Sequence, residues 1–338
     1  MLICACRKFD APSYTLQAFV PRVTQDAYLA IRAFNIDIAR VADSISSTSL
    51  GANIGKMRMQ FWRDAVDKSY AQEPPKEPVA ILLTQALNQL RDRGQKLPLK
   101  AWFHKVIQAR EQYLNNPPYP SLSALESYSE STYSTLLYLT LAFIPMNSVT
   151  CDHIASHIGK AAGISTVLRG LPLLAFPPPP KHHSNTAGLG GVTGTQRQGT
   201  VLLPLEVMAE AGVKEEDVLR KGGDAPGLKD AVFKVATLAN DHLITARTML
   251  MNVRRGEDIG HPYEHEGEEG HGPETRKNAS APAQDVDRAF GVFLPAVATQ
   301  LWLDRLEKCD FNVFDPSLRR SNWKLPLKAY LADRRKRF

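Results

Sequence analysis

Two carboxylates one helical turn apart can hold a divalent cation, and the segment ARVADSISS, residues 39–47, comes close to presenting such a pair. It follows AYLAIRAFNIDI, continues that helical pattern and contains Asp43. Position 39 is alanine, however, and the preceding carboxylate, Asp37, lies six residues before Asp43, which is the wrong spacing for a shared helix face. The cationic Arg40 also opposes metal binding through Coulomb repulsion. The segment therefore offers one metal-binding acid rather than two.

A second candidate is the helix expected over DHIASHIGKAAGISTVLRGLPLL, residues 152–174. We expect Asp152 to cap its start and Pro172 to stop or kink its end. One face carries only small residues, at steps of three and four: Ser156, Gly159, Gly163, Thr166 and Gly170. Such a face indicates either close packing against another helix or the lining of a pocket.

Two segments combine cations with apolar side chains. GKMRMQFWRDAV, residues 55–66, places Arg58, Trp62 and Arg63 among methionines, which suits a partner helix or a membrane if that face is exposed. The alternative is that Met57, Phe61 and Ala65 belong to the core and the charges face solvent. The other segment, NWKLPLKAYLADRRKRF, is typical of an interfacial helix on anionic lipid or of an ordinary last helix with a frayed tail. Its surface candidates are Trp323, Lys328, Arg334 and Arg335.

The chain that must position these residues reads as helical nearly throughout. Apolar residues recur with the helical period, for example in PVAILLTQALNQL and VFLPAVATQLWLDRLEKC, and no long stretch alternates with period two, so we predict an all-α fold. We expect a single domain over residues 13–334, with tails at 1–12 and 335–338. Gly- and Pro-rich segments at 176–199 and 254–284 are predicted to be disordered insertions.

The composition excludes a wholly disordered chain and argues against a membrane-spanning one. The 338 residues are 43% hydrophobic and 22% charged, with no uninterrupted apolar run long enough to span a bilayer. The formal charge of +6 favours anionic surfaces without naming one, and the four cysteines show no C-x-x-C pair, which favours a reducing compartment. The targeting segment is not readable. His261, His265 and His271 lie in a Gly-broken acidic segment without rigid geometry, so we predict no metal and no cofactor.

Three ordered segments, LAIRAFNIDIARVADSIS, GKAAGISTVLRGLP and TVLLPLEVMAEAGV, resemble the squalene/phytoene synthase family of head-to-head prenyltransferases. The resemblance implies an isoprenoid synthase-type helical bundle, in which two D-x-x-x-D helices face each other and hold Mg²⁺ against a substrate diphosphate. Here Ala39 and Asp43 occupy the first motif, and Gly170 and Leu174 occupy the second. Three of four metal-binding aspartates are thus absent, which implies that no catalytic residue remains.

What remains of the pocket by this resemblance is a set of four candidate lining residues. Arg169 keeps the family's arginine position, whereas Gly163 and Thr166 replace its glutamine and asparagine, and Asp43 is the one surviving acid. These residues can line a vestigial pocket able to hold a diphosphate or lipid headgroup. The alternative is that Asp43 and Arg169 form an inherited ion pair or capping contact, because buried charges are usually paired.

A longer resemblance, carried by GKMRMQFWRDAVDKSY, PPKEPVAILL and FDPSLRRSNWKLPL, points to a non-catalytic branch of the same superfamily that acts in the assembly of mitochondrial respiratory complex I. It implies a location on the matrix side of the inner membrane, peripheral contact with lipid, and partners among complex I subunits or assembly intermediates, with no nucleic acid. Two alternatives stay open: a prenyl diphosphate transferase with altered metal ligation, and a prenyl-lipid-binding protein without turnover.

Overall fold

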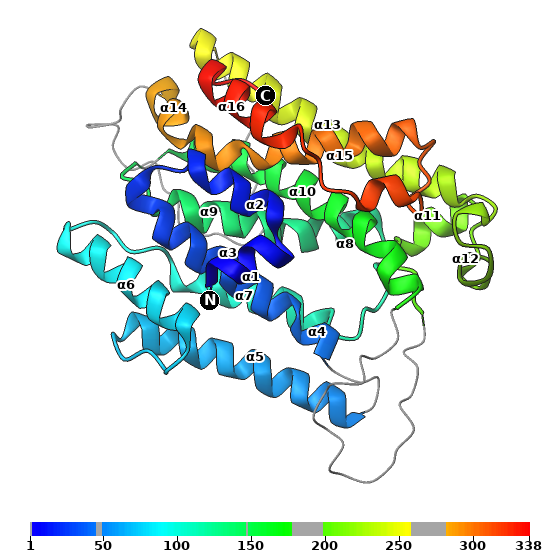
Figure 1. The fold of residues 1–338 in the computed structure, drawn as a ribbon, viewed down its shortest axis with the longest axis horizontal. Coiled ribbons are helices and arrows are strands. Elements are labelled where there is room, and N and C mark those ends of the chain that lie inside the picture. The colour runs from blue at the N-terminus through cyan, green and yellow to red at the C-terminus, as the bar shows by residue number, and fades with distance from the viewer. Residues whose placement is uncertain (1, 45–48, 147, 178–198, 258–281) are drawn as a thin grey trace.

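In the described residues the fold consists of α-helices, with turns and short 3₁₀ segments between many of them (Figure 1). It was obtained as a computed structural model that describes residues 2–44, 49–146, 148–177, 199–257 and 282–338. No β-strand occurs within these ranges, so the all-α prediction is confirmed. The predicted disordered insertions at 176–199 and 254–284 fall largely outside the described residues.

Most helices run between four and 28 residues, with short 3₁₀ segments between some of them. Their bounds are α1 Leu2–Phe9, α2 Ala11–Leu16, α3 Gln25–Ala39, α4 Val41–Ser44, α5 Ser49–Tyr70, α6 Pro78–Asp92, α7 Lys100–Gln112, α8 Leu122–Ser129, α9 Thr135–Leu141, α10 Val149–Ala175, α11 Leu205–Glu210, α12 Glu215–Lys221, α13 Leu228–Arg255, α14 Pro282–Phe293, α15 Pro295–Lys308 and α16 Leu325–Arg335. The π-helical turn η3, Glu130–Ser134, joins α8 to α9.

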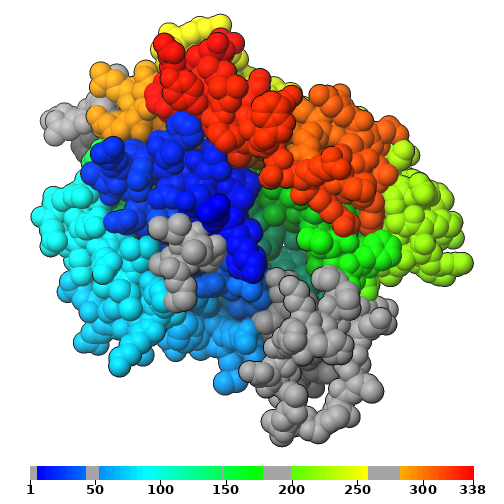
Figure 2. Space-filling model, viewed as in Figure 1, coloured from blue at the N-terminus to red at the C-terminus, as the bar shows by residue number. Residues whose placement is uncertain are grey.

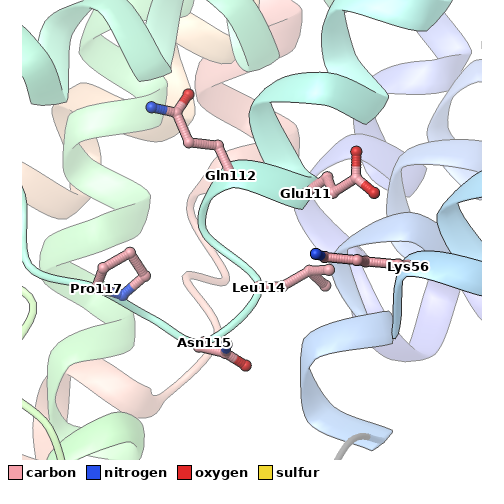
Figure 3. A pocket seen from close by; sticks show the side chains of 6 residues that line it. All are labelled: Lys56, Glu111, Gln112, Leu114, Asn115 and Pro117. Atoms are coloured by element: carbon pink, nitrogen blue, oxygen red, sulfur yellow. The ribbon is translucent and has the colours of Figure 1, made fainter. Parts of the chain in front are cut away.

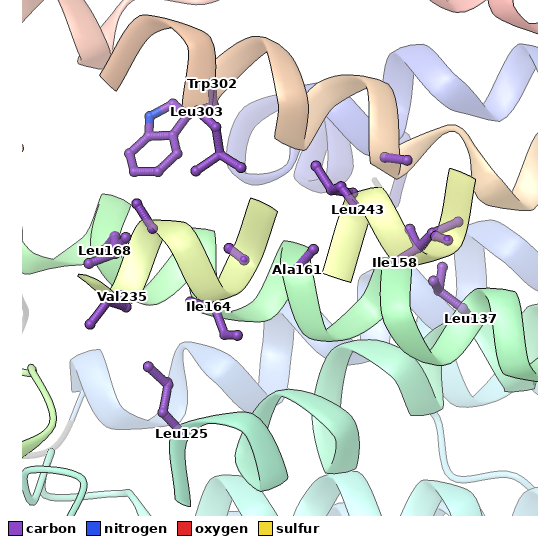
Figure 4. Packing of buried hydrophobic residues seen from close by; sticks show 14 of the residues in the cluster. Leu125, Leu137, Ile158, Ala161, Ile164, Leu168, Val235, Leu243, Trp302 and Leu303 are labelled. Carbon is purple, nitrogen blue, oxygen red and sulfur yellow. The ribbon is translucent and has the colours of Figure 1, made fainter. Parts of the chain in front are cut away.

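The long helix α10 is the centre of the molecule, because α8, η3, α9, α13, α14 and α15 all pack on it. Its apolar side chains make it a core element on several sides rather than an amphipathic surface helix. Figure 4 shows this packing between α10 and its neighbours. The labelled core residues are Leu125, Leu137, Ile158, Ala161, Ile164, Leu168, Val235, Leu243, Trp302 and Leu303.

The ends of α10 differ from the sequence-based expectation. Ser148, rather than Asp152, caps the helix by accepting a hydrogen bond from the backbone N–H of Cys151. Pro172 lies inside the helix, which continues to Ala175, so it does not stop it. A break occurs instead in VFLPAVATQLWLDRLEKC, where Pro295 starts α15 after Leu294, because proline suits the first turn of a helix.

A second core lies between α3, α5, α6 and α7. The ring of Phe34 on α3 meets those of Trp62 and Phe103 edge-on, at centroid distances of 5.6 and 5.3 Å. All seven residues of α9 are buried, and they contribute to both cores.

The two predicted tails are packed parts of the fold. Residues 2–9 form α1, which lies against α3 and buries the Cys6 side chain. At the other end, Phe338 packs on the main core, and its carbonyl oxygen accepts a hydrogen bond from Arg247 Nε at 3.0 Å. The domain boundaries expected at 13 and 334 therefore do not mark where packing begins and ends.

Candidate functional site: an arginine-lined hollow beside the central helix

The small-residue face of α10 provides close packing over part of its length. A Cβ added at Gly159 would lie 2.3 Å from the Cα of Ser134, and one at Gly163 would lie 2.6 Å from the side chain of Ser129. These contacts bring η3 and the end of α8 directly onto the α10 backbone. Gly163, predicted to line a pocket, therefore has a structural role, because it lets the neighbouring Tyr133 approach.

Further along, one side of α10 is open to solvent although the helix is central. Ala162, Thr166 and Arg169 lie on this side and are partly or fully accessible, as is Leu173 one turn later. In Figure 2 the surface is hollowed between the N-terminal helices, drawn in blue, and the orange and green helices. The predicted candidates Thr166 and Arg169 thus share an accessible face of α10.

Arg169 stacks on an aromatic wall, and the ion pair with Asp43 considered from the sequence lies outside the described side chains. Its guanidinium lies 5.1 Å from the ring centroid of Trp302 on α15. Desolvation lowers the pKa of Arg169, while Tyr133 and Asp10 act in the opposite direction. Arg169 is accessible to solvent but is also desolvated by the surrounding protein. Both properties are expected for a side chain in a concave surface.

The opposite wall comes from the N-terminal helices. Asp10, which follows α1, pairs with Arg32 on α3, and Arg32 Nε donates to Asp10 Oδ2 at 2.8 Å. Burial is the largest single influence and lowers the pKa of Arg32, but Asp10, Tyr28 and Tyr133 together outweigh it and raise the pKa overall. Beside them, Tyr28 donates to the carbonyl oxygen of Ser13 at 2.9 Å, and burial raises the pKa of Tyr28 to about 12.

A third cation completes the cluster. Arg110 on α7 donates to Tyr128 Oη at 2.6 Å and to Asn35 Oδ1 at 3.0 Å. Tyr133, on η3, lies with its ring 5.5 Å from the Arg110 guanidinium and also influences the pKa of Arg32 and Arg169. Three arginines from α3, α7 and α10 therefore all interact electrostatically with Tyr133, and Asp10 is the carboxylate that pairs with Arg32.

This arrangement suits an anion better than a cation. Guanidinium groups bind phosphate oxygens in planar, often bidentate geometry. Among the residues that the structure describes, no cluster of three or more histidine, cysteine or acidic side chains is arranged to hold a metal ion. The charge of these residues is therefore suited to a phosphate group rather than to a metal ion.

The segment that corresponds to the first acidic motif is not one continuous helix. Helix α3 ends at Ala39, Arg40 occupies its C-cap, and Asp43 belongs to the short helix α4. The Arg40 guanidinium lies over the ring of Phe9 on α1, 4.1 Å from its centroid. The side chain of Asp43 lies outside the described part of the chain, so its predicted place in the pocket stays a prediction.

A separate surface pocket of about 190 Å³ lies between α5 and the segment that follows α7 (Figure 3). This volume is smaller than the roughly 300–1,000 Å³ of typical ligand pockets. Its lining residues are Lys56, Glu111, Gln112, Leu114, Asn115 and Pro117. None of them belongs to the arginine cluster, so this pocket is separate from that cluster.

The residues exposed on α5 differ from those predicted. Trp62 is only 7% exposed and belongs to the second core, so it cannot serve as a surface anchor. Met57 and Phe61, considered as core residues in the alternative, are instead exposed, with Met57 at 73%. Arg58 is exposed, while Arg63 is half-buried in an ion pair with Glu111.

Sequence reasoning missed the residues that build most of the hollow. Asp10 lay in a segment taken as a tail, and Arg32, Arg110 and Tyr133 come from three other elements. The one local signal was the tyrosine-rich stretch around residue 128, whose rings stack with Tyr113 and Tyr119.

The geometry and the sequence together define a class of protein: the chain belongs to the squalene/phytoene synthase family, whose sequence profile matches residues 6–326. Within that family, the chain is 35% identical over 332 residues, 98% of its length, to the mouse protein named NADH dehydrogenase (ubiquinone) complex I, assembly factor 6, of which 80% is covered. The human protein of the same name is 32% identical over the same coverage, and the Drosophila melanogaster homolog is 32% identical over 90% of this chain and 74% of its own.

Solved structures agree on the fold. A dehydrosqualene synthase in complex with ligand superposes with a TM-score of 0.69 at 12% identity, covering 99% of this chain and 95% of that one. A squalene synthase from Alicyclobacillus acidocaldarius gives a TM-score of 0.62, also at 12% identity, covering 92% and 93%. The predicted isoprenoid synthase-type bundle in a single domain is confirmed.

Proposed function

We propose that this chain is an assembly factor for mitochondrial respiratory complex I and that it acts without transferring a prenyl group. The observation that carries the proposal is its similarity, across nearly its whole length, to proteins named complex I assembly factor 6. Similarity that spans both cores and both ends of the chain is more informative than one shared motif. The solved prenyl synthase structures, in contrast, are only 12% identical to it.

The absence of turnover follows from the chemistry of the inherited site. Prenyl diphosphates ionise when bound metal neutralises the departing diphosphate, and carboxylates must hold that metal. The positions that correspond to three of those carboxylates are Ala39, Gly170 and Leu174. Arg32, Arg110 and Arg169 supply positive charge directly, which favours holding an anion over assembling a metal centre.

The proposed setting is the matrix side of the inner membrane, with complex I subunits or assembly intermediates as partners. No helix within the described ranges is long and apolar enough to cross a membrane. An exposed apolar stripe on α5, formed by Ile54, Met57 and Phe61 at helical spacing, suits contact with a partner subunit, because methionine adapts to varied surfaces.

Deletion of the gene in its own organism, followed by native-gel resolution of respiratory complexes, tests this function. We expect a selective loss of mature complex I, with the other complexes largely spared, and recovery when the wild-type chain is restored. Normal complex I in the deletion strain would contradict the proposal.

A second candidate function, binding of a prenyl or phospholipid headgroup without turnover, is favoured by the arginine cluster itself. Arg169 lies on the accessible face of α10 beside Trp302, and Tyr133, whose ring contacts Arg110, also influences Arg32 and Arg169 electrostatically. A ligand held there would keep its phosphate and leave unchanged. This candidate is compatible with an assembly role, since a bound lipid can be part of what the protein recognises.

A further inference from the structure

The outward face of α16 exposes large apolar side chains to solvent. Trp323, just before the helix, is 80% exposed, and Leu327 and Tyr330 are 59% and 52% exposed. Steps of four and three residues place these side chains on one side. The opposite side, with Leu325 and Ala329, is buried against the core. Helix α16 is thus anchored by one face and presents an aromatic and aliphatic stripe on the other.

The same surface is strongly basic. Between Arg319 and Arg337 the chain has eight basic residues and one acidic residue, Asp333. Asp333 is already paired with Lys336, at 2.7 Å. Lys324 and Lys328 flank the stripe, are exposed and form no ion pair with the described acidic residues. We call the set formed by Trp323, Leu327, Tyr330 and these flanking cations the C-terminal basic face.

The end of α13 extends this face beyond one short helix. Arg254 Nη1 donates to the carbonyl oxygen of Arg335, at 3.5 Å, which places the end of α13 beside the end of α16. Arg255 and Met251 are also exposed there. Figures 1 and 2 show α16, in red, on the surface of the molecule, with the end of α13 beside it. The end of α13 therefore adds exposed basic and apolar side chains next to the C-terminal end of α16.

We propose that the C-terminal basic face docks peripherally on a bilayer that contains anionic lipid. Trp323 and Leu327 enter the headgroup region, and the lysines and arginines contact lipid phosphates. The proposal deepens the proposed function and rests on it for the membrane concerned, because it names the surface of the assembly factor that meets the inner membrane.

Charge and side-chain type together favour lipid over a macromolecular partner. Trp323 is largely exposed and lies beside an aliphatic residue and several cations. Tryptophan favours the membrane interface, because its ring contacts the apolar region while its N–H stays hydrated. Basic residues near such a surface each contribute roughly 1 kcal/mol before screening. An acidic protein surface would satisfy the cations, but it offers no apolar layer for the aromatic stripe.

Co-sedimentation of the full chain with vesicles tests the proposal. We expect binding to phosphatidylcholine vesicles that contain cardiolipin, little binding to phosphatidylcholine alone, and weakening as salt rises. The double variant K324Q/K328Q should bind about tenfold to thirtyfold more weakly, and Trp323→Ala should also bind more weakly. The matched controls are R93Q/K96Q, which removes the same charge from the exposed end of α6, and Met57→Ala on α5. Both should bind like the wild type.

Tryptophan fluorescence gives an independent readout. Binding to anionic vesicles should shift the emission to shorter wavelength in the wild type, and Trp323→Phe should lose most of that shift. Equal binding to neutral vesicles, equal loss in the control variants, or unchanged binding in K324Q/K328Q would overturn the proposal. Because vesicle binding needs no complex I, its failure alongside a complex I defect in the deletion strain would remove this inference and leave the assembly role standing.

Discussion

At the scale of single residues, Glu126 on α8 is a partly buried carboxylate with partners on two other helices. Its Oε1 lies 3.4 Å from His242 Nε2 on α13 and 3.0 Å from Lys160 Nζ on α10. His242 Nδ1 in turn faces His157 Nδ1 at 2.9 Å, so one of these two nitrogens donates and the other accepts. The interaction with His242, helped by Lys160 against the opposing effect of burial, lowers the pKa of Glu126 to about 2.

Glu126→Gln should therefore destabilise the protein in a pH-dependent way. A carboxyl group with a depressed pKa stabilises the fold above its unfolded pKa of 4.5, and this contribution is lost as pH falls toward about 2. We expect the variant to lose roughly 1–3 kcal/mol of unfolding free energy at pH 7. The difference from wild type should shrink below about pH 4.5.

Urea denaturation across this pH range measures the effect. Glu216→Gln, which removes an exposed i,i+4 pair with Arg220, is the matched control and should change stability by less than about 0.5 kcal/mol. A pH-independent loss in Glu126→Gln would show that packing, rather than ionisation, is responsible.

At the scale of elements, the glycines of α10 determine how closely η3 can pack on this helix. They differ in whether a neighbouring segment occupies the space beside them. Gly159 is pressed against the backbone of Ser134, whereas nothing lies within 4 Å of a Cβ built at Gly170. Both lie in the same helix and on the same sequence-predicted face. The sequence pattern could not separate a packing glycine from an open one, because step size alone does not say what the face meets.

Gly159→Ala should destabilise the protein, and Gly170→Ala should not. The new methyl group at position 159 has no room and must push η3 away, at a cost of about 1–3 kcal/mol or more. At position 170, alanine gains helix propensity of about 0.5–1 kcal/mol without a clash. Chemical denaturation of the two variants gives the comparison, and equal stabilities would contradict the role assigned to Gly159.

The sequence-based prediction of which helix face is buried succeeded where one face was clearly apolar and failed where two faces competed. In α5 both Trp62 and the pair Met57 and Phe61 lie in a plausible apolar stripe, and only tertiary packing decides which is buried. The tails were misassigned for a related reason. Short helices such as α1 have too few turns to show a period, and the core that covers them is distant in sequence.

At the scale of the whole molecule, the fold and family followed from the sequence, but the hollow did not. Its wall is assembled from Asp10, Arg32, Arg110, Tyr133 and Arg169, which come from five separate segments. No local spacing links them, and a single sequence without tertiary contacts does not reveal their convergence. What the sequence did indicate was a changed metal motif, because those positions lie a fixed number of residues apart.

Purified chain incubated with Mg²⁺ and farnesyl diphosphate should form no head-to-head product and release no diphosphate above background. Losing the groups that stabilise a departing anion costs several kcal/mol of barrier per group. Product analysis and a diphosphate assay check this, with an active prenyl synthase as the positive control. Metal-dependent turnover that Asp43→Ala abolishes would overturn the non-catalytic proposal.

The same incubation tests the second candidate function, ligand binding without turnover. Retention of unchanged farnesyl diphosphate by the wild type, weakened in Arg169→Gln but not in the exposed control Arg93→Gln, would support a ligand-holding hollow. Absence of retained farnesyl diphosphate would exclude prenyl diphosphate as the ligand and leave the assembly role unaffected.

Helix α9 belongs to both hydrophobic cores, and every one of its residues from Thr135 to Leu141 is buried. A typical helix has an outer face on which inherited variants are harmless, but this one has none. Even conservative missense changes there must alter the volume of one core or the other. We therefore expect even mild amino-acid variation in this seven-residue helix to reduce the amount of folded protein in the cell.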